Sequence, residues 1–585
     1  MGLGSAAMRD WWNRSPAIRG RELLLLAAAA AAIAIAQFMP LVLHLSTRIA
    51  TDLGDPLSQA WQVAWGGHAL FSQPLHFWQS NQFWPAPDSL AFSDALVGYA
   101  PFGAIGSGVG AAVARYNLLL LFAFSLCLVG AYLLARELGA PAWAAAVGGA
   151  AFAWSPWRLW QAGHLHVASS GGVALALFLL LRGYRRGSPR LIFAGWAVAA
   201  WQVSIGFTIG LQLLYLLLAV AALAAACWWR NGRPTASRGV LVASLGGVAF
   251  LAVVSWLISR PYLRVLDQYP KAGRSLGELY RFSPGLEAFV TAPKQSILWG
   301  DLSEAWRPNL KAAQVEQSLY PGIVATLLAG LGLFWAGVPR QLRIGLGLAT
   351  VGFALLSLGV HPGAARFLPY RFVYELLPGW EAVRTPGRLH TLTTLSLALL
   401  ASFGAARVVA AVAARRARIA VQAVAVALVL LVLVDGSGVV YPSATVPQAP
   451  ARISDLPGPI LELPARAENN RRYLIWSTDS FTPMVNGKSS FTPPIYKQTL
   501  AATRDFPSER SIAYLRRLGV RTVVVYTSEV FAGRVEDRQA VGESWRQAAS
   551  HRLPSGIGVS RSLRRPVIIY DLGATAMAEQ RAASQ

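Results

Sequence analysis

Two carboxylates in a polar stretch are the residues of this chain best suited to acid–base chemistry. Asp52 and Asp55 stand in the run Thr51-Asp52-Leu53-Gly54-Asp55-Pro56, which follows the first long apolar segment. A carboxylate there can take a proton from a hydroxyl group within hydrogen-bond reach, as a general base does. Asp followed by Pro also starts helices, so Asp55 has a structural alternative as an N-cap. Asp52 is interpreted as a loop carboxylate or as a second acid of the same site.

Five further polar residues could bind an anion, a sugar or a metal ion. Arg384 and Arg388 precede an apolar segment and offer planar donors to phosphate, although arginines at helix ends also reach lipid headgroups. His164 and His166 form a His-x-His pair that could hold a divalent metal, or they are polar loop residues. Glu316 could bind sugar hydroxyls or could stabilise the start of the helix that follows it.

The elements that must position these residues are apolar helices. The chain has 585 residues, of which 54% are hydrophobic and 14% charged, against roughly 25% charged in soluble proteins. This composition predicts a polytopic α-helical membrane protein with about eleven transmembrane helices. They are expected at 23–45, 118–135, 141–156, 171–181, 191–206, 211–229, 240–258, 320–338, 344–360, 389–414 and 419–434. Segment 95–113 is rich in Gly and Pro, so it is expected to be juxtamembrane or re-entrant rather than a twelfth span.

Arginine clusters in alternate gaps predict the orientation. Gaps such as 182–190, 230–238 and 415–418 are basic and are expected in the cytoplasm, together with the N-terminus. The net charge of +24 is then explained by topology and lipid contacts, without nucleic acid. The long loops and the tail fall on the extracytoplasmic side of the cytoplasmic (inner) membrane of a bacterium. An uncleaved anchor is favoured over a cleaved signal peptide for the first apolar run.

Three regions follow from this topology. Residues 1–22 are the cytoplasmic N-terminus, and 23–434 are the transmembrane domain, including an outer loop at 46–117. That loop is expected to lie on the membrane surface, with Trp61 and Trp65 at the water–lipid interface. Residues 435–585 are expected to form a small extracytoplasmic α/β domain, with a helix at 508–518 and strands at 523–526 and 567–570. The two cysteines, both in apolar runs, predict neither a disulfide framework nor a thiolate metal site.

The outer loop carries a resemblance to a known family. Asp52-Leu53-Gly54-Asp55-Pro56-Leu57 with Trp61 and Trp65, followed by Phe83-Trp84-Pro85 and Ser93-Asp94, resembles the opening of bacterial integral-membrane glycosyltransferases of the GT-C fold. The layout is similar to that of the protein O-mannosyltransferase and lipid A aminoarabinose transferase relatives. The likeness extends to the order of the spans and to an outer C-terminal domain. The chain departs from the mannosyltransferase pattern at Pro56, where those enzymes often have an acidic partner.

The resemblance implies an inverting transferase that uses a polyprenyl-phosphate sugar as donor on the outer membrane face. Asp55 matches the general base of such enzymes, with Asp52 as an accessory acid. Arg384 or Arg388 matches the ligand of the donor phosphate. His164, His166 and Glu316 are expected near the donor, and the need for a divalent metal is left open. The acceptor would be a glycan, a lipid or a protein.

Two other functions remain open from the sequence. A carrier or flippase for lipid-linked sugars could use the same aromatic loop without reacting, and a scaffold protein could bind cell-wall components through its tail. The sequence contains no Walker loop and no Gly-rich turn between a strand and a helix. This pattern disfavours both a soluble nucleotide-sugar donor and ATP-driven transport.

Overall fold

The computed structural model describes residues 6–231, 237–307, 310, 314–361, 369–414, 418–438, 443–449, 453–526, 558–561 and 567–573. The chain divides into two compact units, each built from segments that are distant in sequence. The helical unit comprises Met1–Leu43, Leu118–Arg260 and Gly273–Pro442. The loop–tail unit comprises His44–Asn117, Pro261–Ala272 and Ser443–Gln585. This grouping differs from the predicted division, which placed the outer loop 46–117 with the transmembrane segment.

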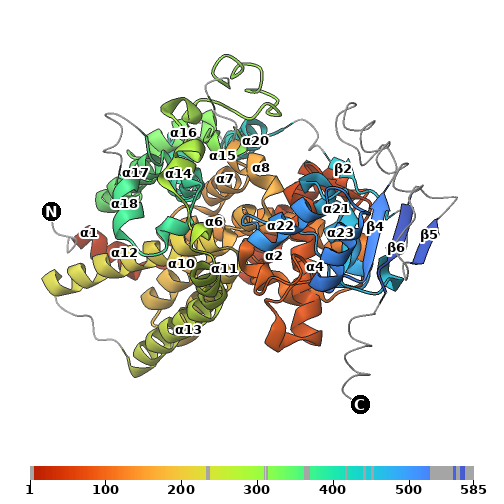
Figure 1. Ribbon diagram of the computed structural model, residues 1–585. Coiled ribbons are helices and arrows are strands. Elements are labelled where there is room, and N and C mark those ends of the chain that lie inside the picture. Colours follow the sequence, from red (N-terminus) through yellow and green to blue (C-terminus); the bar gives the residue numbers. More distant parts are fainter. Residues whose placement is uncertain are drawn as a thin grey trace. The chain divides into compact units, whose positions relative to one another are not determined.

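The helical unit consists of α-helices and the loops between them (Figure 1). Apolar sequences favour this form in a membrane, because a helix satisfies its own backbone hydrogen bonds. The residues of α6 and α13 are shared between the two units. The helices are α1 Ala6–Asn13, α2 Gly20–Gln37, α3 Met39–Val42, α6 Gly108–Leu138, α7 Ala142–Ala153, α8 Pro156–Trp160, α9 Leu165–Ala168, α10 Gly171–Arg185, α11 Pro189–Ile205, α12 Phe207–Asn231, α13 Arg238–Gln268, α14 Leu276–Phe282, α15 Gln314–Gln317, α16 Ile323–Gly332, α17 Arg340–Ser357, α18 Tyr370–Leu376, α19 His390–Ala413 and α20 Arg418–Asp435.

Six helical stretches within the described residues are long and apolar enough to cross a membrane, which fits a polytopic membrane protein. Each of the eleven segments predicted to span falls on a helix, but several are short. For example, α7 has 12 residues and α16 has 10, whereas a perpendicular span needs roughly 20. The count of eleven therefore stays a prediction. The six stretches are Gly20–Gln37, Gly108–Leu138, Leu165–Arg185, Phe207–Cys227, Arg238–Gln268 and Pro386–Ala413.

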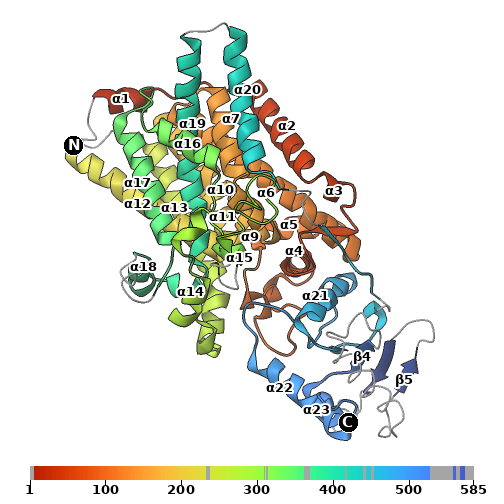
Figure 2. The same cartoon turned by 90° about the horizontal axis from the view of Figure 1, so that it is seen from above.

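Helix α19 forms the centre of the helical unit. It is buried along most of its length and packs against α7, α16, α17 and α20 (Figure 2). Glycines allow α16 and α19 to approach backbone to backbone, as small residues do between membrane helices. A side chain on Gly404 would overlap the carbonyl oxygen of Leu328, and one on Gly332 would overlap that of Leu400. The short 3-10 helix Pro386–Leu389 leads into α19, carries Arg388 and packs against α12, α14, α15 and α17.

The loop–tail unit combines helices with two small sheets. Strand β1 pairs antiparallel with β2, joining the outer loop to the tail. The second sheet has the order β3-β4-β6-β5, with β3 parallel to β4 and the other pairs antiparallel. The predicted helix and strands of the tail are present as α23, β4 and β6, while the side of the membrane stays a prediction. The elements are β1 Arg48–Ala50, α4 Asp55–Ser72, α5 Ala100–Gly103, β2 Ser443–Thr445, β3 Ile460–Leu463, α21 Ala467–Trp476, α22 Pro494–Ala502, α23 Glu509–Leu518, β4 Thr522–Tyr526, β5 Gly558–Arg561 and β6 Val567–Asp571.

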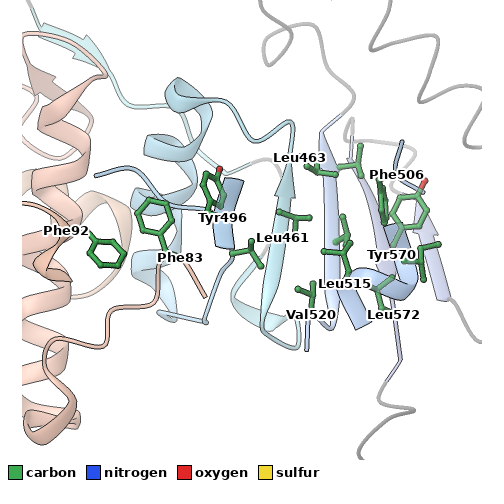
Figure 3. Packing of buried hydrophobic residues seen from close by; sticks show 14 of the residues in the cluster. Phe83, Phe92, Leu461, Leu463, Tyr496, Phe506, Leu515, Val520, Tyr570 and Leu572 are labelled. Atoms are coloured by element: carbon green, nitrogen blue, oxygen red, sulfur yellow. The ribbon is translucent and has the colours of Figure 1, made fainter. Parts of the chain in front are cut away.

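Four aromatic residues of the outer loop, Trp61, Trp65, Phe83 and Phe92, are buried inside this unit. Phe83 and Phe92 extend the apolar cluster formed by the tail, and the ring centroids of Phe83 and Tyr496 are 5.2 Å apart (Figure 3). Trp61 and Trp65 are 1% and 2% exposed. Their indole N–H groups donate to the Asn81 side chain and the Phe77 carbonyl. The prediction that these two indole rings lie at the water–lipid interface is wrong, because both are buried inside the protein. Helix α21 of the tail packs against α4, and the ring centroids of Trp65 and Phe481 are 5.5 Å apart.

Segment 95–113 is interrupted rather than continuous. It contains the 3-10 helix Val97–Tyr99 and the single turn of α5, and α6 then begins at Gly108. Gly106 and Gly108 have φ angles of +74° and +79°, a region that favours glycine. These turns explain why an apolar stretch of this length does not form one helix.

Candidate functional site

Asp55 is the first residue of α4, and its carboxylate is paired with an arginine from the tail. The Oδ1 atom lies 3.2 Å from Arg471 Nη2, and the side chains are 50% and 17% exposed respectively. Helix α21, which carries Arg471, packs against α4. The two residues are 416 positions apart, so no local pattern could predict their contact. Arg471 is the residue of this site that sequence reasoning missed.

Asp52 shapes the turn before α4. Its Oδ1 accepts a 2.7 Å hydrogen bond from the backbone N–H of Gly54, which is the N-cap residue of α4. The prediction of Asp55 as the N-cap is therefore wrong, because the helix starts one residue earlier than predicted and Asp55 is its first residue. Thr51 has a φ of +65°, which is rare for a β-branched residue. The turn of residues 51–54 thus determines where the Asp55 carboxylate lies.

A polar stripe continues from Asp55 along α4. Ser58, Gln59 and Gln62 follow at helical spacing, and Gln59 and Gln62 are 5% and 7% exposed. Gln62 donates to the carbonyl of Asp94 over 2.8 Å. The buried hydroxyl of Ser58 has no hydrogen-bond partner among the described residues. These side chains offer donors and acceptors of the kind that bind sugar hydroxyls.

Four of the predicted site residues meet inside the helical unit. Arg388 donates to Glu316 through Nη2 at 2.6 Å and Nε at 3.2 Å, and both side chains are under 10% exposed. Arg388 Nη1 lies 3.0 Å from His166 Nε2; since arginine can only donate, this nitrogen of His166 accepts. His164 Nε2 lies 4.0 Å from Glu316 Oε1. The sequence predicted these residue types, and the fold brings them together from α15, α9 and the turn before α19.

The charges of this cluster are balanced internally. Burial alone would raise the pKa of Glu316, but the charges of Arg388 and His164 lower that pKa to about 2. Glu316 is therefore ionised at neutral pH and neutralises Arg388. A paired, buried guanidinium attracts an external phosphate less than an unpaired one.

Arg384 is in a different position, with 34% of its side chain exposed. Its Nη1 lies 3.7 Å from Glu278 Oε1, and Arg274 Nη1 lies 3.2 Å from the same oxygen. The guanidinium also lies over the ring of Phe282. Burial and the positive charges of Arg274 and Arg388 lower the pKa of Arg384. Positive charge therefore exceeds negative charge at this point, and an anion beside Arg384 would be stabilised.

A divalent metal at the His164–His166 pair stays a prediction. Among the described residues, no group of three or more His, Cys, Asp or Glu side chains could hold a metal ion. The rings of His164 and His166 have centroids 6.0 Å apart and meet edge to face. His164 contacts Gln161 and Glu316, and His166 contacts Arg388.

Comparison with known proteins identifies the fold. A family model described as "Domain of unknown function (DUF6311)" matches residues 23–435, and no curated protein matches the sequence. The arabinofuranosyltransferase AftD from mycobacteria has a similar structure, with a TM-score of 0.55 and 18% identity. The similarity covers 96% of this chain and 40% of AftD, so the chain spans less than half of that protein's length.

Two further solved structures are similar at lower scores. The oligosaccharyltransferase of Archaeoglobus fulgidus, tethered to an acceptor peptide, has a TM-score of 0.44 and 12% identity, over 90% of this chain and 72% of that one. ArnT from Cupriavidus metallidurans, bound to undecaprenyl phosphate, has a TM-score of 0.39 and 13% identity, over 94% and 98%. The similar structures are glycosyltransferases of the GT-C fold, and the likeness to AftD confirms the predicted fold.

Proposed function

We propose that this chain, which belongs to the DUF6311 family, is a membrane glycosyltransferase that moves a sugar from a polyprenyl-phosphate donor to an extracytoplasmic acceptor. The observation that carries this proposal is the placement of Asp55 in a chain of the GT-C fold. Its carboxylate is half exposed and is held at the start of α4 by a turn and by an arginine. A general base needs both access to the acceptor and a fixed direction.

The proposed reaction is a single displacement at the anomeric carbon. The acceptor hydroxyl oxygen attacks this carbon while the bond from the carbon to the phosphate oxygen breaks. The Asp55 carboxylate takes the hydroxyl proton, and the polyprenyl phosphate leaves with the electron pair of the broken bond. Attack from the face opposite the phosphate inverts the anomeric configuration. Asp52 is proposed to act on the reaction through the turn that it holds before Asp55.

Arg384 is the proposed ligand of the donor phosphate. Negative charge develops on the phosphate as it leaves, and fixed positive charge nearby lowers the energy of that transition state. Arg384 is partly exposed and shares Glu278 with Arg274, whereas Arg388 is nearly buried and lies 2.6 Å from Glu316. The cluster of Arg388, Glu316 and His166 is proposed to hold the turn that carries Arg384, with His164 and Glu316 beside the donor sugar.

The test is transfer by purified protein in lipid nanodiscs supplied with polyprenyl-phosphate sugars that carry a radiolabel on the sugar. We expect release of polyprenyl phosphate and appearance of labelled product on an acceptor from the cell envelope. Asp55→Asn should lower the rate by about 10²–10⁴-fold, the usual contribution of a general base. Asp455→Asn, an exposed acid of the same unit, is the matched control and should keep the wild-type rate.

Two results would contradict the proposal. Full activity of Asp55→Asn would remove this residue from the mechanism. A carrier would be favoured instead if the protein moved intact lipid-linked sugar across a vesicle membrane and released the sugar from none of the donor lipids tested.

A further inference from the structure

We infer that Arg471 is a positioning residue for the reaction, which fixes the carboxylate of Asp55 in the direction that proton transfer needs. The inference rests on the proposed function and extends it to the tail, because Arg471 lies in α21. One carboxylate oxygen, Oδ1, is engaged by Arg471 Nη2 at 3.2 Å. Holding one oxygen of a carboxylate restricts the rotation of the whole group and so fixes the second oxygen.

Helix α21 is anchored firmly enough for this role. Asn470, the neighbour of Arg471, is 3% exposed. Its amide donates to the carbonyl of Gly487 at 3.0 Å and to the hydroxyl of Tyr496 at 2.7 Å. The Tyr473 hydroxyl donates to the carbonyl of Pro464 at 3.2 Å. Buried, satisfied hydrogen bonds of this kind leave a helix little freedom to shift.

The anchor continues into the four-stranded sheet. Asn486 is completely buried and donates to Asn470 Oδ1 at 3.0 Å. It also bonds both backbone groups of Glu462 on β3, accepting from the N–H at 2.7 Å and donating to the carbonyl at 2.8 Å. A continuous set of contacts therefore runs from β3 through Asn486 and Asn470 to α21. Supporting shells of this kind are what hold functional side chains in place.

Folding stability does not account for the pair. Half of the Asp55 side chain is exposed, and exposed ion pairs contribute little to stability because water screens them. The Arg471 guanidinium is held by an ordered helix beside a candidate base. Its Nε is buried and has no hydrogen-bond partner among the described residues. A role in the site explains this placement better than a role in folding stability does.

The test compares Arg471→Met and Arg471→Lys with wild type in the nanodisc assay, with Arg510→Met as control. Arg510 is an exposed arginine of α23 in the same unit. We expect Arg471→Met to lower kcat by roughly 100-fold with the donor KM and the melting temperature near wild type. Arg471→Lys should recover part of kcat, because lysine keeps the charge but not the planar geometry. Arg510→Met should behave as wild type.

A double variant shows whether Arg471 acts through Asp55. If it does, Arg471→Met in an Asp55→Asn background should lower the residual single-turnover rate no further, because residues that act as a unit are not additive. An additive loss, an unchanged kcat in Arg471→Met, or a change in donor KM alone would overturn the inference. If Arg471→Met fails to fold, Arg471→Lys is the variant that tests the inference. A kcat of Arg471→Lys equal to that of wild type would then count against the positioning role of Arg471. Absence of transfer by the wild-type protein would instead reject the proposed function.

Discussion

Arg388 and Glu316 lie 72 residues apart in the sequence and are joined by two hydrogen bonds of 2.6 Å and 3.2 Å in the interior of the helical unit. The pair connects the turn before α19 to α15. Because both side chains are nearly buried, each charge is stabilised in the protein interior mainly by the other. This pair distinguishes two arginines that the sequence could not tell apart. Arg388 is held at 2.6 Å by a buried carboxylate, whereas Arg384 is 34% exposed and lies 3.7 Å from the carboxylate of Glu278.

Removal of Glu316 should therefore destabilise the protein. We expect Glu316→Gln to lower the free energy of unfolding by about 3–5 kcal/mol, because it leaves the Arg388 guanidinium buried without its counterion. Since the folded-state pKa of about 2 lies below the ordinary value of 4.5, this stabilisation is present above pH 4.5 and is lost as pH falls towards 2. Unfolding monitored by tryptophan fluorescence at pH 7 and pH 4 measures both effects. Glu278→Gln, which changes a more exposed acid, should cost much less.

Arg384 should control donor affinity. A charge-assisted hydrogen bond contributes about 1.5–3 kcal/mol, so Arg384→Met should raise the donor KM about 10-fold to 100-fold and leave the acceptor KM unchanged. Steady-state rates at varied concentrations of donor lipid measure this effect. Arg281→Met, an exposed arginine of α14, serves as the matched control. If Arg384→Met has the wild-type donor KM, the phosphate is bound elsewhere.

Glu462 should make the stability of the loop–tail unit fall as the pH rises from 4.5 to 8. Burial raises the pKa of this carboxyl to about 8, although the hydrogen bond from Tyr526 opposes the shift. Between pH 4.5 and 8 the unfolded chain loses this proton and the folded chain keeps it, so stability falls as pH rises through that window. The total loss is on the order of a few kcal/mol.

Thermal unfolding at several pH values, followed by circular dichroism, tests this prediction. Glu462→Gln keeps the shape and cannot ionise, so its melting temperature should vary less between pH 5 and pH 8. An identical pH dependence in both proteins would assign the effect to another group.

The contact between α16 and α19 should tolerate no side chain at Gly404. A Cβ atom there would overlap the Leu328 carbonyl, so Gly404→Ala should force the helices apart and lower the melting temperature by several degrees, a cost of about 1–3 kcal/mol. Gly330 of α16 is the control, because a Cβ atom built on it meets nothing within 4 Å. Gly330→Ala should be neutral or slightly stabilising, since alanine favours helix. Equal melting temperatures for the two variants would contradict the packing.

The sequence by itself determined the fold class and the residues with useful chemistry. Apolar runs of suitable length specify helices wherever they occur, and a turn such as Asp52 to Asp55 is encoded by adjacent residues. Patterns of this kind depend on local interactions, which are present in the linear chain. The same reasoning located the tail helix at 508–518 and its strands, and it recognised that 95–113 is a poor helix former.

Only the tertiary structure decided which charges pair and which apolar side chains are buried. Arg471 meets Asp55, and Arg388 meets Glu316, across distances along the chain that no periodicity records. Trp61 was misplaced for the same reason, because an indole ring is equally suited to a membrane interface and to a protein interior with a hydrogen-bond partner. The choice depends on whether other segments cover it, and here α21 of the tail packs against α4, the helix that carries Trp61.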